Sequence, residues 1–152
     1  MNVHKAHREL LKYCAMNNLE VKRGKSWCYF KSDEVIIEVW RNKPSAAWIY
    51  SMLHELGHFK INKRRNFQER SWKIFKLGGS VAVDLIAAFQ IMREEIEAWE
   101  EGFKLAKKLG IVIDRKEYDQ YSAKFIMNYM KAIPVQYEFW KNFKMADLEK
   151  YV

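Results

Sequence analysis

The sequence predicts an α+β fold that is mostly helical, with a small antiparallel sheet before its first long helix. Two observations lead to this class. Apolar residues recur at helical spacing over several long segments, and two short runs rich in aromatic and β-branched residues lie within the first third of the chain. The chain has 152 residues and no internal repeat, which is the size of one ordinary domain. We therefore expect residues 1–152 to form a single domain.

The N-terminal part of the chain predicts a short helix followed by a β-hairpin. Residues 9–19 place apolar side chains on one side of a helix. Residues 27–31 and 34–40 are rich in aromatic and β-branched residues, which favour strands, and Ser32 and Asp33 between them are turn residues. Strands separated by a short turn pair as an antiparallel hairpin. We therefore expect the small antiparallel sheet here.

A second helix is expected from Ser45 to about Ile61. Pro44 and its polar neighbours end the preceding strand, and the Ser45 side chain can accept a hydrogen bond from a free backbone N–H at the helix start. Apolar residues cover most faces of this helix, which is typical of a buried helix. Polar side chains within it then need partners, because an unpaired buried polar group is costly.

The middle of the chain predicts a short helix and then a long one. The short helix covers residues 68–76, after a polar and basic connection, and two glycines follow it. Ser80 can cap a long helix that runs to about Leu109. Gly110 supplies the C-terminal stop of that helix.

Two last helices are expected after this stop. Asp114 can cap a helix that runs to about Ile133. Pro134 lacks the N–H that a continuing helix would use, so the pattern predicts a boundary there. A separate final helix is then expected over residues 135–150.

Charge and cysteine content limit the classes of protein to which the chain can belong. The formal net charge is +8, which affects partners more than fold. Cys14 and Cys28 are too few for a disulfide framework, so we expect reduced thiols. The N-terminus has no apolar run of the signal-peptide type, and the most apolar segment, residues 81–92, is too short to span a bilayer. We therefore expect a cytoplasmic protein without a membrane partner.

Basic residues cluster in the middle of the chain, which keeps nucleic acid open as a partner. Aromatic residues are interleaved with them, as base stacking would require. The same aromatic residues fit core contacts at helical spacing, and a solvated basic face without a special partner explains the charges equally well. The cluster consists of Lys60, Lys63, Arg64, Arg65, Arg70, Lys73 and Lys76.

The most specific pattern in the sequence is His54-Glu55-Leu56-Gly57-His58, inside the second predicted helix. Positions i and i+4 of a helix project side by side, so His54 and His58 can bind one zinc ion together. The glutamate after the first histidine then points towards the water on that ion, where Glu55 can act as the general base. The chain has four histidines, so a chance match on a surface helix is a poor explanation.

A zinc peptidase keeps three protein ligands and one open position, so a third ligand is expected. No third histidine follows at the metzincin spacing, where Ile61 and Arg64 stand. His4 and His7 lie far back in the sequence and are expected at the surface. A glutamate further along the chain is left.

Helical angles select one of five glutamates on the long helix. The apolar stripe of this helix consists of Met92, Ile96, Trp99, Phe103 and Ala106. Glu95 falls within the stripe, and an ionised carboxylate aimed into a core is rare unless it is paired or binds a metal. The other acids are Glu94, Glu97 and Glu101 on the opposite, solvated face and Glu100 at the side. Glu95 is therefore the expected third ligand, with a buried salt bridge to a lysine or arginine as the alternative.

The same residues carry a resemblance to a known family. Residues 51–58 (SMLHELGH) and 95–99 (EIEAW) resemble the ImmA/IrrE-type zincins, which are gluzincin-type metallopeptidases, and small metallopeptidases of bacteria and their phages. The resemblance implies a zincin-like domain with a short sheet before the active-site helix, Glu95 as the third zinc ligand, and peptide-bond cleavage in the cytosol. The family often has Asp or Asn where this chain has Trp99, so another residue must orient a zinc-binding histidine.

The function expected from the sequence is zinc-dependent hydrolysis of peptide bonds in a protein or peptide. Zn²⁺ would lower the pKa of water towards about 7, and Glu55 would take the proton and pass it to the leaving amine. A further donor should stabilise the oxyanion, and four tyrosines remain open for that role: Tyr50, Tyr118, Tyr121 and Tyr129. Two alternatives are a basic nucleic-acid-binding module and a zincin fold that binds metal without cleaving.

Overall fold

The computed structural model describes residues 1–24, 29–31, 36–40, 44–65 and 81–141. The chain order of the elements is α1 (Val3–Met16), β1 (Glu20–Gly24), β2 (Tyr29–Lys31), β3 (Ile36–Trp40), α2 (Ala46–Arg65), α4 (Val81–Lys108) and α5 (Arg115–Lys141). The described residues are mostly helical, which confirms the mainly helical class. The turn predicted at residues 32–33, the short helix predicted at 68–76 and the Ser80 cap lie outside the described residues.

The described strands form a mixed sheet in the order β1-β3-β2, and not the antiparallel sheet that the sequence predicted. β2 and β3 pair antiparallel, with Phe30 opposite Ile37, while β1 pairs with β3 in parallel and places Val21 opposite Ile37. Charged residues and a glycine make up most of β1, so it carries no apolar alternation that would mark it as a strand. The apolar strand β3 lies in the middle, and Ile37 is fully buried.

Helix α1 begins six residues before its predicted start. Asn2 caps it, because the side-chain Oδ1 accepts a hydrogen bond from the backbone N–H of Lys5 at 3.0 Å. Ala6, Leu10 and Cys14 form its buried face, so the apolar stripe starts among residues that are mostly polar. That polar first turn hid the helix start in the sequence.

Three predicted helix signals are confirmed. The Ser45 Oγ accepts a hydrogen bond from the N–H of Trp48 at 3.2 Å, which caps α2. The Asp114 Oδ1 accepts one from the N–H of Glu117 at 2.8 Å, which caps α5. Gly110 has φ +65° after the end of α4, a conformation that glycine adopts without strain.

The helix boundary predicted at Pro134 is wrong, because α5 continues through it to Lys141. A proline removes one N–H donor and bends a helix, but it ends the helix only where the flanking residues do not favour helical structure. Residues on both sides of Pro134 belong to α5. The part of the predicted last helix beyond Lys141 lies outside the described residues.

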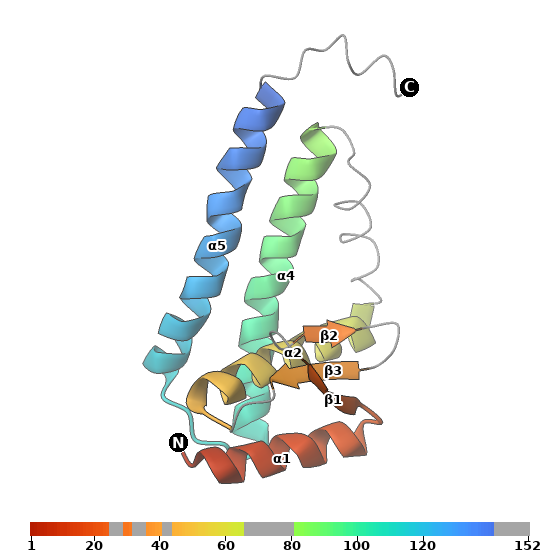
Figure 1. The fold of residues 1–152 in the computed structure, drawn as a ribbon, viewed down its shortest axis with the longest axis vertical. Coiled ribbons are helices and arrows are strands. Elements are labelled where there is room, and N and C mark those ends of the chain that lie inside the picture. The colour runs from red at the N-terminus through yellow and green to blue at the C-terminus, as the bar shows by residue number, and fades with distance from the viewer. Residues whose placement is uncertain (25–28, 32–35, 41–43, 66–80, 142–152) are drawn as a thin grey trace.

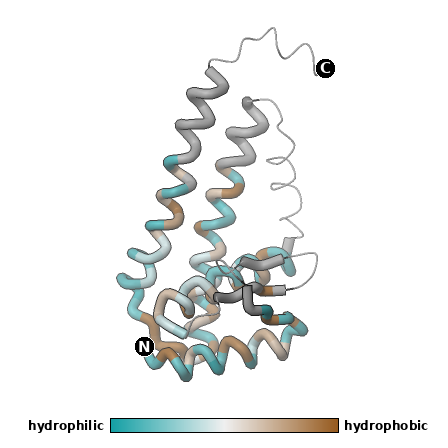
Figure 2. The backbone as a smooth tube through the Cα atoms, viewed as in Figure 1, coloured by the Kyte–Doolittle hydropathy of each residue, from teal (hydrophilic) through white to brown (hydrophobic). Residues whose placement is uncertain are grey.

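The long helices α4 and α5 run side by side, with α1 lying across their lower end (Figure 1). Helix α2 packs mainly on α4, and the sheet packs on the other side of α2. Brown and teal segments alternate along α1 in Figure 2, as expected of a helix with one buried face. No helix in the described ranges combines the length and apolar content that crossing a membrane requires.

Two glycines allow α2 and α4 to approach at the backbone. A Cβ atom on Gly57 would lie 2.7 Å from the carbonyl carbon of Ala98 and closer still to its oxygen. A Cβ atom on Gly102 would lie 2.8 Å from the carbonyl carbon of Leu53. Neither position has room for a larger residue, so the spacing of the two helices depends on both glycines.

Gly57→Ala should lower the free energy of unfolding by about 2–3 kcal/mol, because the added methyl group pushes α2 away from α4. Urea unfolding followed by circular dichroism measures the change. Gly110→Asn is the control: no atom of the described residues lies within 4 Å of a Cβ there, and asparagine tolerates positive φ. An equal loss of unfolding free energy in Gly57→Ala and Gly110→Asn would contradict a close contact of α2 and α4 at Gly57.

Candidate metal centre

The structure brings the three predicted metal ligands together between α2 and α4. The Nε2 atoms of His54 and His58 lie 3.2 Å apart. Glu95 reaches both, with Oε2 at 3.0 Å from His54 Nε2 and Oε1 at 3.4 Å from His58 Nε2. All three residues are buried, and their donor atoms lie within 4.8 Å of one another.

Helix geometry explains the convergence. His54 and His58 lie one turn apart on α2, so both rings face α4, with centroids 4.5 Å apart. The backbone contact between Gly57 and Ala98 brings α4 against this turn. Glu95 lies one turn before Ala98 on α4, which places its carboxylate opposite the two imidazoles.

The donor spacing fits a tetrahedral ion. Zinc bound by nitrogen and oxygen at about 2.0–2.1 Å in a tetrahedron separates its ligand atoms by roughly 3.3–3.4 Å. The two Nε2 atoms are 3.2 Å apart, one Glu95 oxygen lies 3.0 Å from His54 and the other lies 3.4 Å from His58, so each of these contacts is close to that separation. Two imidazoles and one carboxylate are also a ligand set that suits zinc and leaves a fourth position for water.

The pKa values of the two histidines in the cluster are shifted in opposite directions. Burial and, after it, the charge of His58 lower the pKa of His54 to about 4, and Glu95 offsets only part of this shift. Burial would also lower the pKa of His58, but Glu94 and Glu95 outweigh it and raise that pKa to about 10. Burial would raise the pKa of Glu95, yet its two histidine contacts hold that pKa far below the ordinary value. At neutral pH the cluster therefore holds a carboxylate at Glu95, a neutral His54 and a protonated His58, so binding of a cation by both histidines would release the proton of His58.

Glu94 is a residue that the sequence analysis placed wrongly. It was expected on the solvated face of α4, but it is 5% exposed, and its Oε1 lies 3.4 Å from Nδ1 of His58. Among the described residues, neither its oxygens nor His58 Nδ1 has a hydrogen bond of good geometry. A carboxylate behind a metal-binding histidine fixes the tautomer and orientation of the ring. Glu94 stands in that position.

Glu101 was also expected in solvent and is instead 5% exposed. Its carboxylate lies 2.6 Å from the Lys60 ammonium and 2.9 Å from that of Lys104, with Arg64 at 3.7 Å. Ile96 shows the opposite error, since it was assigned to the apolar stripe and is 43% exposed. The buried surface of α4 is therefore wider on its acidic side than a single stripe predicts.

Trp99 packs against the first histidine. Its ring stacks on that of His54 at a centroid distance of 4.2 Å and an angle of 19°. The Tyr118 hydroxyl of α5 donates a hydrogen bond to the backbone carbonyl of Trp99 at 3.0 Å, which ties this turn of α4 to α5. The family that the chain resembles often has Asp or Asn at this position, where it can orient a zinc-binding histidine. In this chain the Trp99 ring contacts the His54 ring by stacking instead.

Glu55 lies beside the cluster on its more exposed side. Its Oε1 is 4.0 Å from Nε2 of His54, and the side chains of both residues are 11% exposed. The side chains of His58 and Glu95 are 6% exposed. All four side chains are therefore largely buried, with those of His54 and Glu55 slightly more exposed than the other two.

The tyrosines left open by the sequence have different surroundings. Tyr118 is 1% exposed and bonded to Trp99, so it belongs to the core. The Tyr50 hydroxyl donates to Glu117 at 3.3 Å. The Tyr121 hydroxyl lies 3.0 Å from Oγ of Ser51, one turn before His54. The Tyr129 side chain lies outside the described residues.

The other histidines and Cys14 do not belong to the group of His54, His58 and Glu95. His4 is exposed, as expected, whereas His7 is half-buried with its ring 4.7 Å from that of Trp48. Cys14 is a buried free thiol, and Cys28 lies outside the described residues.

Comparison with known proteins finds no significant match to this chain. No protein-family model matches the chain. No curated protein and no solved structure matches it significantly. The function must therefore be argued from the site itself.

Glu101→Gln should lower the free energy of unfolding at neutral pH by about 1–3 kcal/mol, because it leaves Lys60 without its buried partner. Burial opposes the charge of Glu101, but its basic partners lower the pKa to about 2. The stabilisation is thus present above the ordinary glutamate pKa and is lost as the pH falls from about 4.5 towards 2. Urea unfolding at a series of pH values measures it.

Glu20→Gln is the control for this titration, since its carboxylate is 61% exposed and 3.5 Å from Lys22. Its effect should stay below about 0.5 kcal/mol. If Glu101→Gln lowered the free energy of unfolding equally at neutral and at acidic pH, the ion pairs of Glu101 would not be the cause.

Proposed function

We propose that the chain is a zinc-dependent metallopeptidase with a zincin-like fold of the gluzincin type. In this proposal, His54, His58 and Glu95 bind the ion and Glu55 is the catalytic base. The observation that carries the proposal is the convergence of three buried donor atoms beside the buried carboxylate of Glu55. The substrates would be proteins or peptides.

The chemistry divides between the ion and the protein. A bound zinc ion would lower the pKa of water and polarise the scissile carbonyl group. Glu55 would accept the proton of the attacking water and deliver it to the leaving amine. Glu94 would accept a hydrogen bond from Nδ1–H of His58, and Trp99 would hold the ring of His54 by stacking.

A nucleic-acid-binding function has weaker support. Two cations of the basic cluster are already engaged with carboxylates of α4: Lys60 with Glu101 at 2.6 Å, and Arg64 with Glu97 at 3.3 Å. Contacts to phosphates would have to compete with these pairs. The buried histidine–glutamate cluster would also have no role in such a function.

Purified wild-type protein should bind about one zinc ion per chain, and His54→Ala and Glu95→Gln should abolish tight binding. Glu94→Gln should weaken zinc binding by about 10- to 100-fold, because the amide cannot orient His58 as a carboxylate does. Competition with a chromophoric chelator measures the affinities. Circular dichroism establishes that each variant is folded.

Glu97→Gln is the matched control for these variants. It lies on the same helix, but its carboxylate pairs with Arg64 near the surface. Its zinc affinity should equal that of wild type. Failure of the folded wild type to bind zinc would refute the metal centre, and loss of zinc from Glu97→Gln would refute the ligand assignment.

Glu55→Gln should keep zinc affinity within about threefold and lower peptide cleavage by roughly 10²–10⁴-fold, because the base is removed and the ligands remain. A fluorogenic peptide library with zinc-loaded protein measures the rate. If zinc-loaded wild type cleaves no peptide, the zincin that binds metal without cleaving becomes the better description. An equal rate in Glu55→Gln would contradict the role of the base.

A further inference from the structure

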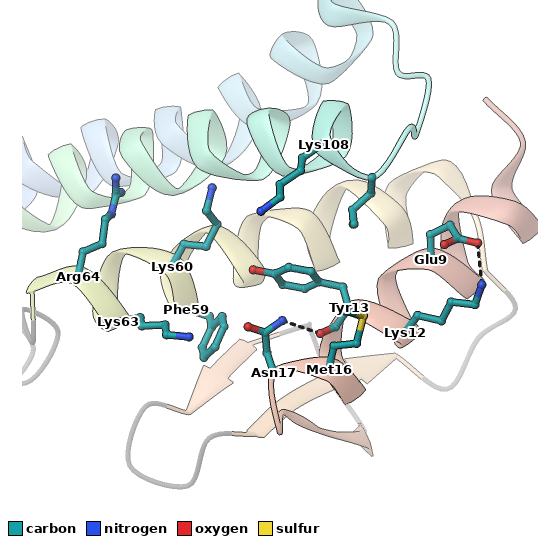
Figure 3. A pocket seen from close by; sticks show the side chains of 11 residues that line it. Glu9, Lys12, Tyr13, Met16, Asn17, Phe59, Lys60, Lys63, Arg64 and Lys108 are labelled. Atoms are coloured by element: carbon teal, nitrogen blue, oxygen red, sulfur yellow. Dashed lines mark hydrogen bonds and ion pairs between the residues drawn. The ribbon is translucent and has the colours of Figure 1, made fainter.

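A basic groove lies on the side of the molecule formed by α1, α2 and the end of α4. Its volume is about 590 Å³, which is large enough for a few amino-acid side chains (Figure 3). Its basic lining residues come from three helices: Lys12 from α1, Lys60, Lys63 and Arg64 from α2, and Lys108 from α4. Among the described residues, Glu9 is the one acid in this lining.

Carboxylates lie next to some of the basic residues of the groove but not next to others. Lys60 and Arg64 pair with Glu101 and Glu97 of α4. Lys12 lies 3.4 Å from Glu9. Lys63 and Lys108 are exposed and have no carboxylate partner within the described part of the chain. As far as the described residues show, these two ammonium groups therefore present positive charge to a ligand in the groove without a neighbouring carboxylate.

An apolar surface lies between these charges. Tyr13 and Phe59 line the middle of the groove, and Met16 adds an 84% exposed side chain at its edge. Figure 3 shows the Tyr13 ring between Lys60, Lys108 and Phe59. A ligand that fits this surface carries an apolar group with negative charges beside it.

The groove and the metal cluster use different sides of α2. At 100° per residue, four groove residues of α2 are separated from His54 and His58 by roughly 80–180° around the helix axis: Phe59, Lys60, Lys63 and Arg64. A ligand in the groove therefore approaches the helix away from the His54 and His58 rings. Binding of a ligand in the groove is therefore independent of zinc binding or peptide cleavage at the cluster.

We propose that this groove binds an acidic segment of a partner protein. An apolar side chain of the segment packs on Tyr13, and flanking carboxylates pair with Lys63 and Lys108. Two observations favour a peptide over a nucleic acid. Phe59 is 7% exposed, so it offers little ring face for base stacking, and the guanidinium group of Arg64 is already engaged by Glu97.

The test is a fluorescence-anisotropy titration with a short labelled peptide of alternating glutamate and leucine. The comparison probes are the same peptide with glutamine in place of glutamate, and single-stranded oligothymidylate. Lys63→Glu/Lys108→Glu should weaken binding of the acidic peptide by at least about tenfold. The control is Lys124→Glu, an exposed lysine of α5 outside the groove, which should change the affinity by less than about twofold.

The acidic peptide should bind wild type more tightly than the glutamine peptide, and added salt should weaken it. His54→Ala should bind the acidic peptide as tightly as wild type does, which would show that binding in the groove does not require the metal centre. No measurable binding to wild type would overturn the proposal, as would equal effects of the double variant and Lys124→Glu. Tighter binding of oligothymidylate, lost in the double variant, would overturn it in favour of a nucleic-acid site.

Discussion

The backbone contact between α2 and α4 is the constraint on which the rest of the described structure depends. Gly57 lies against the carbonyl group of Ala98, and Gly102 lies against that of Leu53, so the helices meet without side chains between them at two turns. At this separation the short side chain of Glu95 reaches both imidazoles of α2. The same contact buries Leu53 and Leu56 completely, so one feature provides both core packing and the geometry of the site.

This interface buries an unusual number of ionisable groups, and it satisfies them in two different ways. Glu101 is surrounded by Lys60, Lys104 and Arg64, which balance its charge within the protein. Around His58, carboxylates outnumber the basic groups, and several polar atoms there have no hydrogen bond among the described residues. A buried group left unsatisfied costs free energy, and the cation proposed for this cluster would offset that cost.

The sequence was most informative where a local rule decides the outcome. Ser45 and Asp114 mark helix starts because each side chain caps a backbone N–H of the first turn. Gly110 marks a helix end because its positive φ stops the last turn. The spacing of His54 and His58 likewise fixes their proximity within one helix. Glu94 and Glu101 were misplaced because a helix wheel assumes one buried face, whereas α4 is covered over a wider arc by α2. The parallel pairing of β1 depends on how the chain returns after α1, which no local pattern specifies.

The donor triad of His54, His58 and Glu95 joins residues that lie far apart in the chain. His54 and His58 are neighbours as soon as α2 is helical, but Glu95 comes from a helix much later in the chain. Bringing Glu95 against the two rings therefore costs loop-closure entropy, because α4 must return to α2 across a large sequence separation. The pair of rings is a local feature of one helix, whereas the complete donor triad depends on the packing of α4, which Tyr118 of α5 also contacts.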